Sequence, residues 1–202
     1  MTLSIQDLYG HGWSLWSCWR PRAGYKVGGD FCYMFLGEKS LVTAVVDVLG
    51  HGEEAYRCAL ELFNVMNKHE ENLETLFTML EATAARYRGC ALFLGALSDS
   101  LIKYIMVGNM RAWVLQEPGK IDLLYAQPGV VGGRRLNPVT REVKLAGTCA
   151  LIVCSDGIRR SFVPPKDYLS LTYDGMEIVG KILEKYGIHE DDASILVGRR
   201  CR

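Results

Sequence analysis

The sequence predicts an α+β protein in which helices cover the faces of antiparallel sheets. Strand-like segments come in blocks, a pair of amphipathic helices follows the first block, and one more helix precedes the last strand. Short polar links such as Ser98–Ser100 and Glu117–Lys120 join successive strand-like segments in the manner of hairpins. Hairpin links favour antiparallel pairing, and this order of elements differs from the strict strand–helix alternation of parallel sheets.

Three strands are expected before the first helix. From Trp13 to Trp19, and again from Lys26 to Leu36, aromatic and other apolar residues are interleaved with small or polar ones, which is typical of half-buried strands. The apolar run from Leu41 to Val46 predicts the third strand.

Helical periodicity then replaces the strand pattern twice in succession. Apolar residues recur at helical spacing from Ala55 to Met66 and from Leu73 to Tyr87, and Asn72 is placed to cap the second helix. A third amphipathic helix is expected from Asp174, which begins a capping box, to Tyr186.

The remaining strand-like segments alternate with turn signals. The loosest stretch is Gln127 to Arg141, which is rich in Gly, Pro and Arg and is expected to be a surface loop. The strands expected in this part of the chain are Cys90–Leu97, Leu101–Val107, Ala112–Gln116, Ile121–Tyr125, Val143–Leu145, Cys149–Cys154 and Ala193–Val197.

Length and composition predict one soluble domain, residues 1–202. The chain has 202 residues, 49% of them hydrophobic, which is enough for a substantial core and short for two domains. The 23 basic residues equal the 23 acidic ones, so no overall charge attracts nucleic acid or an anionic membrane surface. No apolar run is long enough to span a bilayer, and the first ten residues lack the order of a signal peptide.

The cysteines indicate a reducing compartment. There are seven of them, an odd number, and no Cys-x-x-Cys pair is present, so neither a disulfide framework nor a zinc site fits well. Most lie inside apolar runs, where a cysteine acts as a small core residue. We therefore expect a cytoplasmic protein.

Four aspartates, Asp30, Asp47, Asp156 and Asp191, each lie at or near the end of an apolar strand. If these strands pair, the carboxylates converge, and their burial is unfavourable unless a cation neutralises them. Carboxylate oxygens suit Mg²⁺ or Mn²⁺, and two such ions roughly 3.5–4 Å apart can bind a phosphoryl group. Asp156-Gly157 alone is better explained as a turn. The four positions together predict a two-ion metal site.

At these residues the sequence resembles the PPM family of metal-dependent Ser/Thr protein phosphatases. The resemblance is to the bacterial branch that includes SpoIIE, RsbU and RsbX, is greatest to the RsbX type, and covers nearly the whole chain. The motifs that carry it, in the order of the family, are Arg20-Pro21, Val27-Gly28-Gly29-Asp30-Phe31, Asp47-Val48-Leu49-Gly50-His51-Gly52, Gly108-Asn109, Ser155-Asp156-Gly157 and Asp191-Asp192-Ala193-Ser194.

The resemblance implies a four-layer α-β-β-α sandwich of two antiparallel sheets flanked by helices, with two Mn²⁺ or Mg²⁺ ions at one end. It implies that Asp47 is the catalytic carboxylate that bridges both ions and that the Val48 carbonyl joins one of them. Asp156 and Asp191 would hold the other ion, and Asp30 would act directly or through water.

Three features leave roles open. His51 is a candidate general acid for the leaving seryl oxygen, with helix capping or partner binding as the alternatives. Asn109 stands where much of the family has an aspartate that helps to bind a third ion, so no strong third site is expected. The arginine that grips phosphate in long relatives has no clear counterpart. Arg20, Arg22 and Lys26 are candidates, and each is also explained as a solvated surface charge.

The resemblance implies hydrolysis of phosphoserine or phosphothreonine on another protein, without a phosphoenzyme. Because we expect the chain to be a catalytic domain alone, we favour an RsbX-like role. The substrate would be a stressosome scaffold or another STAS-domain protein, and its dephosphorylation would be negative feedback on sigma-factor activation. The alternatives are an RsbU-like phosphatase of an anti-anti-sigma factor, a pseudo-phosphatase that binds a partner without turnover, and a hydrolase of small phosphoesters.

Overall fold

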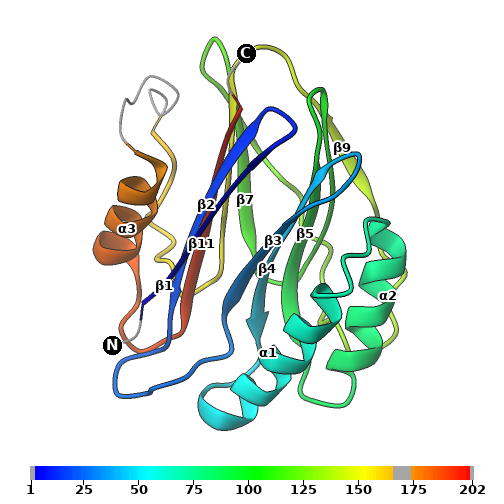
Figure 1. The fold of residues 1–202 in the computed structure, drawn as a ribbon. Coiled ribbons are helices and arrows are strands. Elements are labelled where there is room, and N and C mark those ends of the chain that lie inside the picture. The colour runs from blue at the N-terminus through cyan, green and yellow to red at the C-terminus, as the bar shows by residue number, and fades with distance from the viewer. Residues whose placement is uncertain (1–2, 166–173, 201–202) are drawn as a thin grey trace.

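Two antiparallel sheets stack face to face in the structure, a computed structural model that describes residues 3–165 and 174–200 (Figure 1). The first sheet has the strand order β1 (Ser4–Gly10), β2 (Trp13–Arg20), β11 (Ala193–Arg200), β10 (Cys149–Cys154), β7 (Arg111–Gln116), β8 (Lys120–Leu123). The second has the order β3 (Phe31–Leu36), β4 (Leu41–Val48), β5 (Cys90–Leu97), β6 (Leu101–Val107), β9 (Arg141–Lys144). Every pairing within the two sheets is antiparallel, as predicted.

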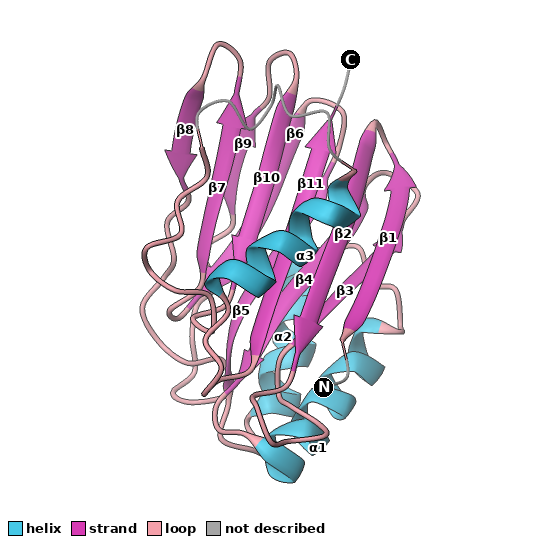
Figure 2. Ribbon diagram, turned by 90° about the vertical axis from the view of Figure 1, so that its left-hand side faces the viewer, coloured by secondary structure: helices cyan, strands magenta, loops and turns pink. Residues whose placement is uncertain are grey.

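Helices cover the outer face of each sheet. The helices α1 (Gly52–Met66) and α2 (Leu73–Ala84) pack on the second sheet, against β4 and β5. Helix α3 (Gly175–Tyr186) lies across the first sheet, against β2 and β11 (Figure 2). The predicted α-β-β-α sandwich is therefore confirmed. None of the helices in the described ranges is long and apolar enough to cross a bilayer.

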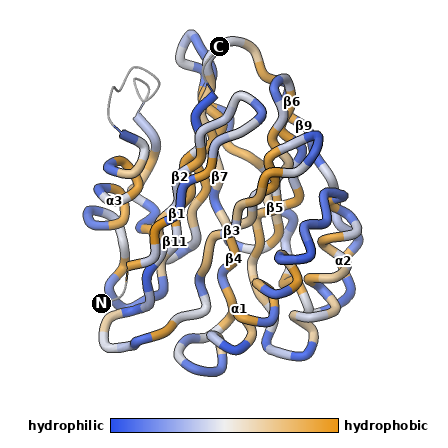
Figure 3. Tube along the Cα trace, in the orientation of Figure 1, coloured by the Kyte–Doolittle hydropathy of each residue, from blue (hydrophilic) through white to orange (hydrophobic). Residues whose placement is uncertain are grey.

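The apolar core is layered in the same way. Along β4, Val42 and Val46 pack towards the helices α1 and α2, whereas Leu41 and Val45 pack between the two sheets. Both faces of this strand are buried, which explains why its sequence is a continuous apolar run without alternation. Figure 3 shows the apolar segments gathered on the inner strands and on the inward faces of the helices. The clusters also include Cys58, Cys90, Cys149 and Cys154.

Two of the predicted helix starts have side-chain caps. Asn72 Oδ1 accepts a hydrogen bond of 2.8 Å from the backbone N–H of Thr75, as expected for α2. Asp174 Oδ1 accepts one of 3.2 Å from the backbone N–H of Met176 at the start of α3. The Glu177 side chain forms an ion pair with Lys181, one turn further along the same helix.

Two segments near the N-terminus differ from the prediction. Strand β1 was not expected; it pairs with β2 through a two-residue turn, His11-Gly12, in which both residues have positive φ. Such turns usually contain Asn-Gly or Asp-Gly, so the His-Gly sequence did not predict this turn. The predicted strand from Lys26 begins only at Phe31, because the backbone N–H of Gly29 donates to the Asp192 carboxylate instead of to a neighbouring strand.

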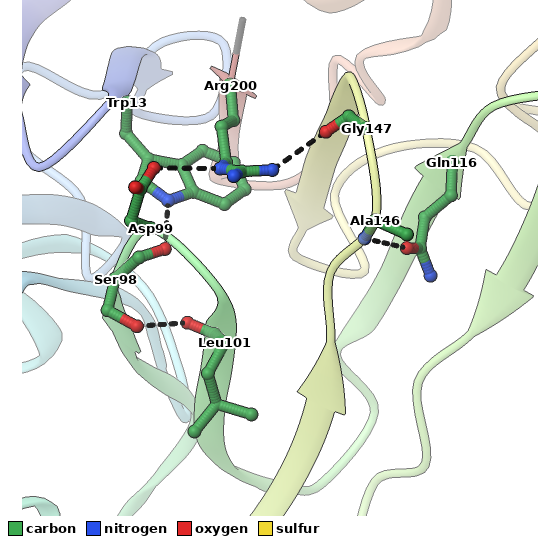
Figure 4. Close-up of polar contacts among 8 residues, drawn as sticks. All are labelled: Trp13, Ser98, Asp99, Leu101, Gln116, Ala146, Gly147 and Arg200. Atoms are coloured by element: carbon green, nitrogen blue, oxygen red, sulfur yellow. Dashed lines mark hydrogen bonds and ion pairs between the residues drawn. The ribbon is translucent and has the colours of Figure 1, made fainter. Parts of the chain in front are cut away.

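Polar contacts connect the two sheets at one end of the sandwich (Figure 4). The buried Arg200 side chain donates from Nε to Asp99 Oδ1 at 3.3 Å and from Nη1 to the Gly147 carbonyl at 2.7 Å. Trp13 Nε1 donates to the Ser98 carbonyl at 2.9 Å. These contacts join the β1–β2 and β5–β6 hairpins to the strand ends of β10 and β11, and leave the opposite end of the sandwich to the aspartates.

Candidate metal centre

The four aspartates predicted to bind metal lie at the same end of the sandwich. Asp30 directly precedes β3, and Asp47 is the penultimate residue of β4. Asp156 follows β10 by two residues, and Asp191 precedes β11 by two. Since β3 is antiparallel to β4 and β10 to β11, the start of one strand lies beside the end of its neighbour. These ends are the lower ends of the sheets in Figure 1.

Three of these carboxylates line one pocket. Asp47, Asp156 and Asp191 are on the wall of a cavity of about 420 Å³. Asp30 is on the wall of a second cavity of about 330 Å³, which the β2–β3 loop and α1 also line. The other residues of the first cavity are Leu49, Gly50, Ala91, Gly108, Asn109, Pro128, Gly129 and Val130.

Asp47 has the most perturbed carboxyl group of the cluster. Burial raises the pKa of Asp47 to about 10, and the charges of Asp30 and Asp156 act in the same direction. A hydrogen-bond contact between the Asp47 and Asp156 side chains contributes as well. Two carboxylates at hydrogen-bond distance repel each other unless a proton or a cation lies between them. At neutral pH this contact therefore requires one or the other.

Asp30 is oriented by two serines. Its side chain is only 6% exposed, and its Oδ2 accepts a hydrogen bond of 2.9 Å from Ser194 Oγ. Burial raises the pKa of Asp30 to about 7, although a hydrogen bond from Ser155 acts in the opposite direction. Ser155 Oγ in turn accepts a bond of 3.1 Å from the backbone N–H of Ser194. The serines belong to the sequence motifs, but their polarity alone did not reveal this orienting role.

The adjacent residues Asp191 and Asp192 have different surroundings. Burial raises the pKa of Asp191, and the charge of Asp156 adds to the shift. Asp192 is 4% exposed and accepts hydrogen bonds from the backbone N–H groups of Arg22, at 2.8 Å, and Gly29, at 2.7 Å. Asp191 is thus directed to the pocket, whereas Asp192 holds the β2–β3 loop against the start of β11.

The donor set fits hard divalent cations. Carboxylate oxygens are the ligands that Mg²⁺ and Mn²⁺ prefer, and burial raises the pKa values of Asp30 and Asp47, so a bound cation would favour their ionised forms. A cation beside Asp47 and Asp156 would remove their repulsion. Within the described ranges, no group of three or more His, Cys, Asp or Glu side chains is already arranged to hold a metal ion.

Neither a family model nor a curated protein matches the sequence at a significant level, but solved structures do. One, from work on the bacterial stressosome as a modular system adapted to control secondary messenger signalling, is 26% identical with a TM-score of 0.81, over 98% of this chain and 100% of that one. RsbX with magnesium is 21% identical with a TM-score of 0.82, over 97% and 99% of the two chains. The catalytic domain of the serine/threonine phosphatase PstP with two manganese ions is 11% identical with a TM-score of 0.64, over the full length of both.

The chain has the fold of the PPM phosphatases. The resemblance inferred from the motifs is confirmed at this level, together with the sandwich that it implied. The solved PPM structures with magnesium and manganese show that this fold binds such ions in those proteins.

Val48 and His51 follow the central aspartate of the PPM motif. Val48 is buried at 2% exposure, and its carbonyl oxygen would lie 3.1 Å from a Cβ atom at position 29, so Gly29 allows the β2–β3 loop to approach it. His51 is exposed and occupies the N-cap of α1, but its side chain makes no capping hydrogen bond. Its ring contacts the Tyr25 ring edge-on at 5.2 Å and is not on the wall of the aspartate cavity.

The candidate phosphate-gripping residues near the first PPM motif have other contacts. Arg20 is buried and donates to the carbonyl oxygens of Pro21, Ile188 and Asp191. It is therefore a bracing residue and not a solvated surface charge. The Arg22 guanidinium lies over the Tyr25 ring, 4.9 Å from its centroid. Lys26 is exposed and lines the second cavity with Asp30.

Asn109 acts on a predicted ligand directly. Its Nδ2 donates a hydrogen bond of 2.6 Å to Asp156 Oδ2. The amide therefore orients this carboxylate, which an aspartate at the same position would repel.

The sequence did not indicate the contribution of the loop after β8. Pro128, Gly129 and Val130 form part of the cavity wall, although the loop was expected only at the surface. The pairing of Cys90 with Val131 holds this loop beside the start of β5, through hydrogen bonds of 3.0 and 2.9 Å. Gly and Pro enrichment signals a loop but not its location, so no sequence pattern identified this wall.

Proposed function

We propose that the chain is a metal-dependent protein phosphatase that hydrolyses phosphoserine or phosphothreonine on another protein. The observation that carries the proposal is the convergence of Asp47, Asp156 and Asp191 on one cavity, at the end of a PPM fold. Such a cluster cannot be fully ionised at neutral pH unless positive charge is added, and hard cations are the positive charge that oxygen donors select.

The chain's own residues have distinct parts in this proposal. Asp47 would contact both cations as the bridging carboxylate, with Asp156 and Asp191 on one side and the Val48 carbonyl on the other. Asp30 would complete the set directly or through water. Two bound Mg²⁺ or Mn²⁺ ions supply acidity to water and neutralise charge on a phosphoryl group.

Two further groups bear on proton transfer and orientation. The hydrogen bond from Asn109 keeps Asp156 turned to the cavity. His51 stays the candidate general acid, since its exposed ring is free to protonate a leaving seryl oxygen once a substrate covers it.

The biological context that we propose is the bacterial stress-signalling complex, with the chain acting as one phosphatase domain, residues 1–202, in the cytoplasm. The support is the similarity to RsbX and to the structure from work on the stressosome. The substrate would be a phosphorylated stressosome scaffold or another STAS-domain protein, and its dephosphorylation would restrain sigma-factor activation.

The test is phosphate release from a panel of phosphorylated STAS-domain proteins, with para-nitrophenyl phosphate as the small-ester comparison. We expect turnover of a phosphoprotein in Mn²⁺ or Mg²⁺ and none in excess EDTA. Binding of the phosphoproteins without turnover in any divalent ion would instead indicate a pseudo-phosphatase. Hydrolysis of the small ester alone would contradict a protein substrate.

A matched pair of variants links turnover to the cavity. Asp47→Asn removes the proposed bridging carboxylate, whereas Asp7→Asn removes an exposed carboxylate on β1. We expect turnover to disappear in the first and to stay at the wild-type level in the second.

A further inference from the structure

The proposed metal centre has no net positive charge with which to attract an anionic substrate. Four carboxylates, those of Asp30, Asp47, Asp156 and Asp191, carry a formal charge of −4 when ionised. Two divalent cations would bring this charge to zero. A phosphate monoester is close to a dianion at neutral pH, so its capture requires a further positive group at the rim of the cavity.

Two arginines, Arg20 and Arg111, are committed to other contacts. Arg20 is buried against three backbone carbonyls; burial lowers the pKa of its guanidinium, and the negative charge of Asp192 acts in the opposite direction. Arg111 donates to the carbonyl oxygens of Ile158 and Phe162. These guanidinium groups brace loops around the site and have few donors left for a ligand.

Arg88 is placed differently. It is exposed, in the turn between α2 and β5, and it has no hydrogen bond or ion pair with any residue that the structure describes. Its guanidinium lies over Gly50, where a Cβ atom would be 3.1 Å from Arg88 Nη1. Gly50 lines the cavity three residues after Asp47 and has a φ of +107°, so a side chain there would be strained as well as crowded.

The backbone beneath Arg88 is fixed to the cavity wall. The Gly89 carbonyl accepts a hydrogen bond of 3.0 Å from the backbone N–H of Leu49. Val130, on the same wall, packs so closely on Gly89 that a Cβ atom there would lie 2.5 Å from its Cγ1. A hydrogen-bonded backbone that carries an exposed guanidinium beside the cavity wall is the arrangement expected of an anion-binding arginine.

We infer that Arg88 is the phosphate-binding arginine of this chain and receives the phosphoryl oxygens of the substrate. This inference rests on the proposed function for its substrate class. The guanidinium offers a planar fork of donors that can bind two phosphoryl oxygens at once, which a lysine ammonium cannot reproduce. The group comes from the α2–β5 turn and not from the segment before the first acidic motif.

The first test measures binding without turnover. Inorganic phosphate is titrated into Mg²⁺-loaded protein by isothermal calorimetry, for the wild type, Arg88→Ala and Arg86→Ala. Arg86 is an exposed arginine two residues away that forms an ion pair with Glu61, so its loss changes the net charge equally. We expect the dissociation constant to rise about 10-fold or more in Arg88→Ala, which is the usual loss for a charge-assisted bond, and to change less than 3-fold in Arg86→Ala.

The second test separates binding from chemistry. With a phosphoserine peptide, Arg88→Ala should raise KM about 10-fold with a smaller change in kcat, and Arg88→Lys should restore only part of the loss. Wild-type phosphate affinity in Arg88→Ala, or an equal loss in Arg86→Ala, would overturn the inference. If the wild-type protein bound phosphate through Arg88 but cleaved no phosphopeptide, the proposed function would fail while the inference held.

Discussion

Replacing Asp30 by Asn should make the metal-free protein more stable at pH 8. The reason is the pKa of Asp30, which burial raises from 3.8 to about 7 in the folded protein. A carboxyl group with a raised folded-state pKa binds more protons when folded than when unfolded. Its contribution to stability is therefore present at low pH and is lost as the pH rises towards the folded-state pKa.

The size of the effect follows from the window between these pKa values. Between pH 5 and pH 8 the contribution of Asp30 to the free energy of unfolding falls by an amount that corresponds to about two pKa units. At roughly 1.4 kcal/mol per unit this is about 3 kcal/mol. For a chain of 202 residues this corresponds to about 6 to 12 °C in the thermal midpoint. The raised pKa of Asp47 acts in the same direction.

The assay is thermal unfolding in excess EDTA at pH 5 and pH 8, followed by circular dichroism. We expect the wild-type midpoint to fall between the two pH values and that of Asp30→Asn to fall less. Asp7→Asn, which changes an exposed carboxylate, should follow the wild type. A wild-type midpoint that is equal or higher at pH 8 would refute the reasoning, as would a lower stability of Asp30→Asn at pH 8.

Four further outcomes are expected. Mg²⁺ or Mn²⁺ should raise the wild-type thermal midpoint at pH 8 in a concentration-dependent way. A midpoint that neither ion changes would exclude binding of these ions to the aspartates of the folded protein. Asp47→Asn should abolish turnover while keeping the circular dichroism spectrum, and near wild-type turnover would remove its bridging role. Asn109→Asp places a second carboxylate where the Asn109 amide lies 2.6 Å from Asp156, so it should lower the stability of the metal-free protein at pH 8 and increase the stabilisation by added metal. Melting curves and a calorimetric metal titration identical to those of the wild type would contradict this. Gly157→Ala should destabilise by about 3 kcal/mol or more in denaturant unfolding, because the new Cβ would lie 1.8 Å from the Asp192 carbonyl oxygen, and wild-type stability would show that the loop moves freely.

Most strands and helices were predictable because their patterns are local. The apolar run of β4 and the helical spacing of α1 and α2 report burial directly. Strand β1 was missed since its exposed residues, Ile5 and Tyr9 among them, include apolar ones, which blurs the alternation. The Lys26 segment was extended wrongly because only a distant carboxylate, that of Asp192, diverts it from the sheet.

The candidate site was predictable in its ligands but not in their support. Aspartates at strand ends can be recognised in the sequence, and the antiparallel strand order brings them together. The Ser194 bond to Asp30 and the Asn109 bond to Asp156 each join residues 47 or more positions apart. The role inferred for Arg88 could not be predicted from the sequence, because Arg88 is one of many basic residues there and only the structure places its guanidinium over Gly50.

The two ends of the sandwich have opposite electrostatic character, which bears on whether metal is needed for folding. At one end, burial raises the pKa values of Asp30 and Asp47, so ionisation of these carboxyl groups destabilises the metal-free protein as the pH rises. At the other, the buried Arg200 joins Asp99 and the Gly147 carbonyl across the strand ends (Figure 4). The core between the sheets includes fully buried residues such as Phe93 and Leu151, and burial of each such side chain contributes about 2 kcal/mol. Because this core and the far end are independent of the aspartates, we expect the chain to fold without metal and to gain stability when ions bind.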